Sequence, residues 1–334
     1  MSIVTPTDAQ IERAIRILRS GGLVAFPTET VYGLGADASN AAAVARIFEA
    51  KGRPASHPLI VHLSGAHALP DWARDVPEIA LRLAERFWPG PLTMILARAP
   101  GVLQAVTGGQ DSIGLRVPSH PVAMALLQGF GGGIAAPSAN RFGRVSATTA
   151  QHVRDELGER VDLILDGGAC PVGIESTIVD LTSGNPVLLR PGRITAQEIE
   201  AALQMSMGRA NAASPRASGT LAAHYAPRVP LRLVSGGTLD AAVREAAARQ
   251  PVAVLARHPR PTYSNATVWM VAPLDALEYA RLLYAGLRQL DASGCGLILV
   301  EALPDTPDWA AVRDRLARAA AGSASGAAPV DRGP

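Results

Sequence analysis

Short apolar runs that alternate with helical patterns constrain the fold of this chain most. Strands buried on both faces read as continuous apolar runs, whereas amphipathic helices repeat their apolar residues every 3.6 positions. Several neighbouring runs are joined by connections too short for a helical crossover, which favours a mixed sheet. We predict strands at Leu23–Phe26, Leu59–Leu63, Leu92–Ala97, Ile113–Val117, Ile134–Ala136, Leu163–Leu165, Ile178–Leu181 and Val187–Leu189. The fold class is therefore α/β, with a twisted mixed sheet of at least six strands flanked by helices.

The same alternation divides the chain into domains. Residues 1–204 form the first predicted domain, with helices expected near 7–22, 40–50, 77–87, 121–128, 149–157 and 195–203. Residues 205–229 lose periodicity and gain Ser, Gly, Pro and Ala, which predicts a linker. A second alternation over 230–320 predicts a smaller α/β domain, and residues 321–334 are predicted to be a disordered tail.

Composition excludes several classes of protein. The formal net charge of +2 gives no strong electrostatic reason to expect binding to nucleic acid or to an anionic membrane. Two cysteines are too few for a disulfide framework. The N-terminus does not have the pattern of a secretory signal, and no stretch approaches 18 uninterrupted apolar residues. We expect a cytoplasmic protein that does not contact a membrane.

Of 31 basic side chains, a single lysine, Lys51, stands among arginines, in the sequence AKGRPASHPL. Gly52 and Pro54 end the preceding helix, so Lys51 and Arg53 are placed at a helix C-terminus, where the helix dipole favours cations. The same pair could clamp a polyphosphate, with lysine as a point charge and arginine as a planar fork. The residues themselves leave both interpretations open.

Three other segments carry polar residues next to predicted strands. FPTETVYGLGADA, at 26–38, is either a ligand-binding loop or an ordinary glycine turn. Ser138 and Asn140, in APSAN, could bind phosphate or ribose oxygens, or could bond to their own backbone as turn formers. Arg116 lies within an apolar strand and needs an internal carboxylate or an anionic ligand.

Other catalytic patterns are missing. The histidines at 57, 62 and 67 do not have the spacing of a helical zinc site. The sequence contains neither G-x-x-x-x-G-K-[ST], nor G-x-S-x-G, nor H-E-x-x-H, which excludes the P-loop, α/β-hydrolase and zincin motifs.

Together these segments resemble the Sua5/YrdC/YwlC family of threonylcarbamoyl-AMP synthases. The matching pieces, in order, are FPTETVYGLG, AKGRP with HPLIVHL, WPGPLTMIL, GLRVPSHP, APSAN, ESTIVDL and LRPG, which are spread over residues 26–192. SPRASGTLAAHYAP at 214–227 is similar to the linker of the longer, Sua5-type members. The resemblance implies a YrdC-like first domain and a Rossmann-like C-terminal Sua5 domain.

The resemblance also implies a nucleotidyltransferase that joins L-threonine, bicarbonate and ATP into threonylcarbamoyl-AMP and pyrophosphate. The product supplies the t6A37 modification of tRNA through a threonylcarbamoyl-transfer complex, with no stable binding of nucleic acid expected. Lys51 and Arg53 would be catalytic and hold the triphosphate, and Mg²⁺ would be bound mainly by phosphate oxygens rather than by a protein metal site.

The same resemblance implies the remaining site residues. ATP would also contact His57, Ser112, Ser138, Asn140, Ser146, Arg190 and Tyr225, the last as part of a lid. L-Threonine would be bound by Thr30, His62, Arg116, Ala136 and Ser176. Two alternative functions are a tRNA- or double-stranded-RNA-binding module and a carbamoyl-transfer domain of the hydrogenase-maturation type.

Overall fold

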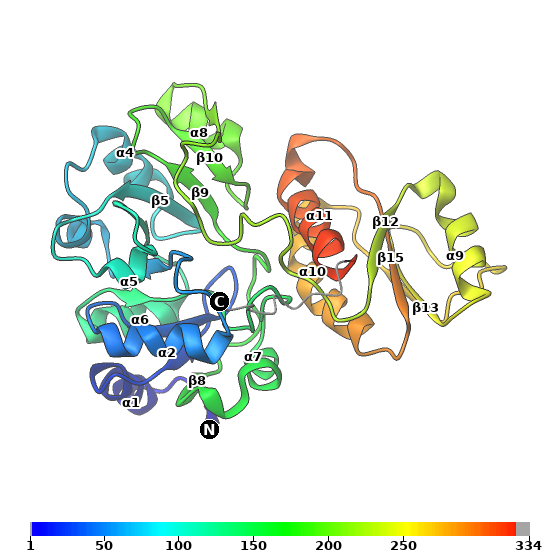
Figure 1. The fold of residues 1–334 in the computed structure, drawn as a ribbon, viewed down its shortest axis with the longest axis horizontal. Coiled ribbons are helices and arrows are strands. Elements are labelled where there is room, and N and C mark those ends of the chain that lie inside the picture. The colour runs from blue at the N-terminus through cyan, green and yellow to red at the C-terminus, as the bar shows by residue number, and fades with distance from the viewer. Residues whose placement is uncertain (1, 325–334) are drawn as a thin grey trace, which may run out of the picture. The chain divides into compact units, whose positions relative to one another are not determined.

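The computed structural model describes residues 2–324, which divide into two compact units (Figure 1). The first unit takes the described residues up to Phe142 and then Ala147–Thr220. The second takes Gly143–Ser146 and the described residues from Leu221 onward. A four-residue stretch in the middle of the first unit's sequence therefore belongs to the second.

A single mixed sheet runs through the first unit and confirms the predicted fold class. Within the described residues it has 11 strands in the order β1-β8-β2-β3-β7-β4-β6-β5-β9-β10-β11. The strands are β1 (Ser2–Val4), β2 (Val24–Phe26), β3 (Gly33–Asp37), β4 (Ile60–His62), β5 (Leu92–Ala97), β6 (Ser112–Arg116), β7 (Ile134–Ala135), β8 (Leu163–Leu165), β9 (Thr177–Asp180), β10 (Val187–Arg190) and β11 (Gly208–Arg209).

Helices pack against this sheet from the same unit. They are α1 (Asp8–Arg19), α2 (Ala41–Lys51), α3 (Leu69–Trp72), α4 (Glu78–Phe87), α5 (Gln104–Thr107), α6 (Pro121–Phe130), α7 (Ala150–Leu157) and α8 (Ala196–Leu203). The Asn40 side chain caps α2, and Gly52 ends it in the left-handed region at φ 60°. The last helical residue of α2 is Lys51.

Two apolar cores explain why the strands near the N-terminal helices read as unbroken apolar runs. Val24 and Phe26 of β2 point into a core with α1 and α6, while Ala25 between them points into the larger core on the opposite face. Successive side chains of a strand alternate between faces, so a strand covered on both sides has no polar position.

The strands farther along the sheet are covered differently. Met94 and Leu96 of β5 enter the larger core, whereas Ile95 points to the other face. There Ile95 packs with Ile178 and with Ala217, a residue of the predicted linker. This face therefore has a thin cover of extended chain, and it is the face that carries polar side chains.

The second unit is a separate α/β layer structure. Its four strands are all parallel, in the order β12-β15-β13-β14, and α9 lies on one side of them with α10 and α11 on the other (Figure 1). The elements are β12 (Leu231–Val234), α9 (Leu239–Ala247), β13 (Val252–Ala256), β14 (Val268–Val271), α10 (Ala276–Asp291), β15 (Leu297–Glu301) and α11 (Ala310–Ala324).

Two sequence-based expectations need correction. Residues 33–37 were expected within a loop but form β3, antiparallel to β2, because Gly33 and Gly35 lie against the ring of Phe26. Helix α11 continues to Ala324, so residues 321–324 of the predicted disordered tail are helical. Residues 325–334 of that predicted tail lie outside the described residues.

Gly192 tests how tightly the end of β10 packs against β9. A Cβ atom at this position would lie 2.4 Å from the backbone nitrogen of Thr177, so we expect Gly192→Ala to lower the free energy of unfolding by about 1–3 kcal/mol. Urea denaturation measures the change. Gly101→Ala is the matched control, because a Cβ there has no neighbour within 4 Å. Equal stability of the two variants would contradict this packing.

Candidate active site

Polar side chains gather on one face of the central strands, where period-2 alternation places them. Ser112, Gly114 and Arg116 alternate along β6 with Ile113 and Leu115, which point into the larger core. In the neighbouring strand β4, His62 pairs in register with Arg116. The alternation that builds the core on one face therefore builds a polar surface on the other.

Lys51 is buried and bonded to a loop distant in the sequence. Its ammonium group donates to the carbonyl oxygens of Ser138 at 2.6 Å and Asn140 at 2.5 Å. Burial, followed by the charge of Arg53, lowers the pKa of Lys51 well below its usual value. Lys51 thus joins the AKGRP segment to the APSAN segment, which the helix-cap interpretation does not require.

Arg53 lies close to the segment predicted to be a linker. Its Nη2 donates to the carbonyl of Pro58 at 2.8 Å and to the hydroxyl of Ser218 at 3.2 Å. The guanidinium also lies over the ring of Phe142, against which His57 packs at 5.1 Å between centroids. Burial, together with the charges of Arg53 and Arg216, lowers the pKa of His57.

Arg190 is a second buried cation, and it bonds to Ser176. Arg190 donates to the carbonyl of Ser176 through Nε at 3.1 Å and Nη2 at 2.9 Å, and to the carbonyl of Ser218 through Nη1 at 2.7 Å. The hydroxyl of Ser176 also lies 2.8 Å from that of Thr93. Ser218 therefore contacts the guanidinium groups of both Arg190 and Arg53.

Arg116 is held at three positions by its own unit. It donates to the Thr30 hydroxyl at 2.9 Å and to the Gly90 carbonyl at 3.3 Å, and its Nη2 lies 2.7 Å from a carboxylate oxygen of Glu29. Glu29 was not assigned from the sequence, although the need of Arg116 for a carboxylate or an anion was. The ion pair supplies that carboxylate.

His62 is buried, and neither ring nitrogen has a hydrogen-bond partner among the described residues. Burial is the main cause that lowers its pKa well below 6.5, and the positive charge of Arg116 adds to it. The ring is therefore neutral near pH 7, with both nitrogens available to a polar ligand.

The APSAN segment contacts β4 and Lys51 through its backbone. Ala136 donates its N–H to the carbonyl of Ile60 at 2.9 Å, next to His62 on β4. Ser138 and Asn140 accept from Lys51 through their carbonyls, as described above. The side-chain amide of Asn140 donates to the carbonyl of Arg141, which is the local bonding expected of a turn former.

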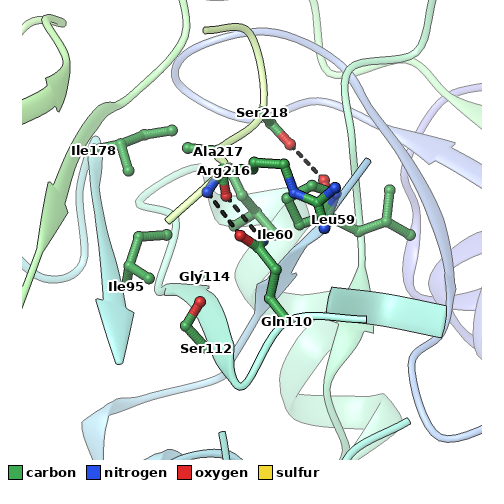
Figure 2. A pocket seen from close by; sticks show the side chains of 11 residues that line it. Leu59, Ile60, Ile95, Gln110, Ser112, Gly114, Ile178, Arg216, Ala217 and Ser218 are labelled. Atoms are coloured by element: carbon green, nitrogen blue, oxygen red, sulfur yellow. Dashed lines mark hydrogen bonds between the residues drawn. The ribbon is translucent and has the colours of Figure 1, made fainter. Parts of the chain in front are cut away.

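Residues 216–218, which we call the covering segment, lie over this polar face (Figure 2). The side-chain amide of Gln110 bonds both backbone groups of Arg216, accepting from its N–H at 2.7 Å and donating to its carbonyl at 3.1 Å. The space left beneath, beside Ser112 and Gly114, has a volume of about 10 Å³, close to the room of one water. The covering segment therefore occupies the surface of the predicted ATP residues.

A larger cleft opens elsewhere on the first unit, with a volume of about 410 Å³. It is bounded by the segment 86–91, and Glu29 lies in its wall together with Ser119, Arg193 and Glu198. Glu29 thus connects this cleft with Arg116.

Two predicted ATP residues, Ser146 and Tyr225, belong to the second unit. Within it, Arg288 donates to the carbonyl of Ser146 at 3.3 Å. Tyr225 is buried, with its backbone in the left-handed region at φ 59° and its ring stacked on that of Tyr284 at 5.7 Å. Their predicted roles at the nucleotide remain predictions.

Sequence reasoning missed four residues that the structure places at the site: Glu29, Thr93, Gln110 and Ser218. Thr93 and Ser176 have a signal in the sequence, since each interrupts or precedes an apolar strand. The contacts of Gln110 with Arg216 and of Ser218 with Arg53 have none, because they join residues 106 and 165 positions apart.

Among residues 2–324, no helix is both long enough and apolar enough to cross a membrane. No group of three or more His, Cys, Asp or Glu side chains in that range is arranged to hold a metal ion.

The buried neutral ring of His62 predicts a pH dependence of stability. Below pH 6.5 the unfolded state takes up a proton at this histidine while the folded state does not, so the free energy of unfolding falls as the pH falls. We expect wild type to lose up to about 1.4 kcal/mol per pH unit more than His62→Gln in this range. Urea denaturation between pH 7.5 and 5.0 measures it. The exposed His67, changed to Gln, is the control and should keep the wild-type slope. A His62→Gln slope equal to that of wild type would contradict the burial of a neutral ring.

Comparisons with known proteins agree with the order of these segments. The family profile of Sua5, YciO and YrdC, described as "Telomere recombination", matches residues 16–192, and the profile "Threonylcarbamoyl-AMP synthase, C-terminal domain" matches residues 194–321. The threonylcarbamoyl-AMP synthase of Bacillus subtilis is 40% identical, over 96% of this chain and 95% of its own. That of Pyrococcus abyssi is 39% identical, over 96% of this chain and 98% of its own. The crystal structure of P. abyssi Sua5 complexed with L-threonine superposes with a TM-score of 0.88 at 36% identity, covering 95% of this chain and 96% of that one. The chain belongs to the Sua5/YrdC family and carries both of the domains that its longer members have.

Proposed function

We propose that this chain is a threonylcarbamoyl-AMP synthase that converts L-threonine, bicarbonate and ATP into threonylcarbamoyl-AMP and pyrophosphate. The observation that carries the proposal is that the first unit holds two buried sets of polar side chains. Lys51, Arg53 and Arg190 form a buried cationic set suited to a triphosphate. Thr30, His62 and Arg116 form a smaller polar set suited to an amino acid.

The reaction requires mainly that the substrates are positioned and that developing negative charge is compensated. L-Threonine and bicarbonate condense to threonine carbamate with loss of water. The carbamate attacks the α-phosphorus of ATP while pyrophosphate leaves, so no protein nucleophile is needed. Lys51 and Arg53 stabilise the negative charge that develops on the leaving pyrophosphate. Ser112, Ser138, Asn140, Arg190 and His57 complete the first unit's nucleotide contacts.

Threonine binds beside the nucleotide through residues that the structure brings together. Arg116 binds the carboxylate, and Thr30, already bonded to Arg116, sets its orientation. His62, Ser176 and the backbone of Ala136 contact the rest of the substrate. His62 suits this role because both of its nitrogens lack a partner among the described residues.

ATP binding requires the covering segment to move. Ser218 accepts hydrogen bonds from Arg53 at its hydroxyl and from Arg190 at its carbonyl. Phosphate oxygens need the same N–H donors. The departure of Ser218 exposes both guanidinium groups together. The empty site therefore keeps its cations bonded to the chain itself until the nucleotide replaces Ser218.

Magnesium and the cellular context belong to the same proposal. Lys51 is bonded to the backbone carbonyls of Ser138 and Asn140 and lies near the charges of Arg53, Glu156 and Glu175. No group of three metal-ligating side chains occurs among the described residues, so Mg²⁺ arrives with ATP and is held mainly by phosphate oxygens and water. We propose a cytoplasmic enzyme whose product passes to a tRNA threonylcarbamoyl-transfer complex. Among the described residues, no observation favours the alternative of an RNA-binding module or of a hydrogenase-maturation carbamoyl-transfer domain.

Purified protein with L-threonine, bicarbonate, Mg²⁺ and ATP should release pyrophosphate and form threonylcarbamoyl-AMP. Mass spectrometry identifies the adenylate, and a coupled phosphate assay measures pyrophosphate. Omitting threonine should remove the adenylate, because AMP transfer needs the carbamate as its acceptor. Pyrophosphate release that is unchanged without threonine, with no adenylate detected, would refute the proposal.

Lys51→Ala should lower the rate by about 100-fold or more, as expected when a charge-stabilising donor is removed. Lys51→Arg should also fail substantially, because a planar fork does not fit between the carbonyls of Ser138 and Asn140 where a point charge does. Steady-state kinetics measures both rates, and circular dichroism checks the fold. The exposed Glu49, on the same helix, serves as the control when changed to Ala. Turnover near that of wild type in Lys51→Ala would return Lys51 to a purely structural role.

A further inference from the structure

Glu29 and Arg116 form a buried ion pair whose geometry is incomplete. Their side chains are 7% and 5% exposed, and Oε1 of Glu29 lies 2.7 Å from Nη2 of Arg116. Despite this distance, neither atom takes part in a hydrogen bond within the described residues. The two charges touch without aligning donor and acceptor, which leaves hydrogen-bonding capacity on both.

The surroundings hold each partner in place. The backbone N–H of Ser119 donates to Oε2 of Glu29 at 3.1 Å, and the backbone carbonyl of Glu29 accepts from Val172 at 2.8 Å. Arg116 is fixed by Thr30 and by the carbonyl of Gly90. The oxygen and nitrogen that face each other are thus preorganised as an ion pair without a hydrogen bond between them.

A zwitterionic amino acid complements this pair. It carries a carboxylate and an ammonium group on one carbon, so its two charges can meet a guanidinium and a carboxylate that stand side by side. Glu29 also lines the cleft of about 410 Å³, which gives a small polar molecule room to reach it. A ligand with a carboxylate alone would satisfy Arg116 and leave Oε1 of Glu29 without a partner.

We propose that Glu29 binds the α-ammonium group of L-threonine while Arg116 binds its carboxylate, which makes Glu29 a specificity residue for α-amino acids. The inference rests on the proposed function, since it names a contact of that enzyme's substrate. It assigns to the glutamate of FPTETVYGLG a role separate from that of Thr30 beside it. The site then rejects hydroxy acids and simple carboxylates because they leave a buried charge unpaired.

Calorimetric titration of two ligands tests the contact. L-Threonine carries all three polar groups, and 3-hydroxybutanoate keeps the carboxylate and the hydroxyl but lacks the amino group. Wild type should bind threonine at least about 10-fold to 100-fold more tightly, the range of a charge-assisted hydrogen bond. In Glu29→Gln the affinity for threonine should fall by about that factor, while the affinity for 3-hydroxybutanoate should stay within about twofold. The preference between the two ligands would then be lost.

Two controls separate this contact from a structural role. Glu198→Gln removes a carboxylate from the same cleft, and Gln can still cap α8, so this variant should keep the wild-type preference. Glu29→Asp keeps the charge and should retain most of the preference, which provides a second variant if Glu29→Gln does not fold.

Several results would overturn the inference. An equal loss of affinity for both ligands in Glu29→Gln would mean that Glu29 only positions Arg116. Tighter binding of both would mean that Glu29 competes with the substrate carboxylate. An unchanged preference in Glu29→Gln would exclude the contact altogether. Absence of threonine binding by wild type, in contrast, would refute the proposed function itself.

Discussion

Buried positive charge is the constraint on which the first unit depends. Lys51, Arg53, Arg116 and Arg190 are all buried, and a cation removed from water must be compensated by nearby dipoles or charges. Backbone carbonyls of Ser138, Asn140, Pro58 and Ser176 provide much of that compensation. Carboxylates add to that compensation, because Glu29 pairs with Arg116 and the charges of Glu156 and Glu175 act on Lys51.

The sheet makes this arrangement possible because at β6 one of its faces is apolar and the other is polar. Ile113 and Leu115 anchor β6 in the apolar core, and the side chains between them point to the polar face without loss of packing. Helices do not cover that face at Ile95 and Ile178, where Ala217 of the covering segment takes their place. The covering segment is held by hydrogen bonds with Gln110, Arg53 and Arg190, and these bonds must break for this surface to open to a substrate.

Much of the fold could be predicted from the sequence, since the alternation of apolar runs depends only on local periodicity. The strands at Leu92–Ala97 and Leu163–Leu165 agree with prediction to the residue. The strand at Gly33–Asp37 was missed because its pairing depends on close contact of glycines with Phe26, which periodicity does not report. In the site, the need of Arg116 for an anion followed from its apolar strand, but the identity of Glu29 as that partner required the folded backbone. The contacts of Ser218 and Gln110 depend equally on chain segments that only the tertiary structure brings together.

The passage of Gly143–Ser146 into the second unit has a consequence for synthesis on the ribosome. Arg144 forms an isolated β-bridge with Ala226, and Ala226 donates its N–H to the carbonyl of Gly143 at 2.8 Å. Domains generally fold as they emerge, the N-terminal one first. All strands of the first unit are translated before the chain that pairs with these four residues is made. The nascent protein must therefore keep this short loop accessible until the second unit is made.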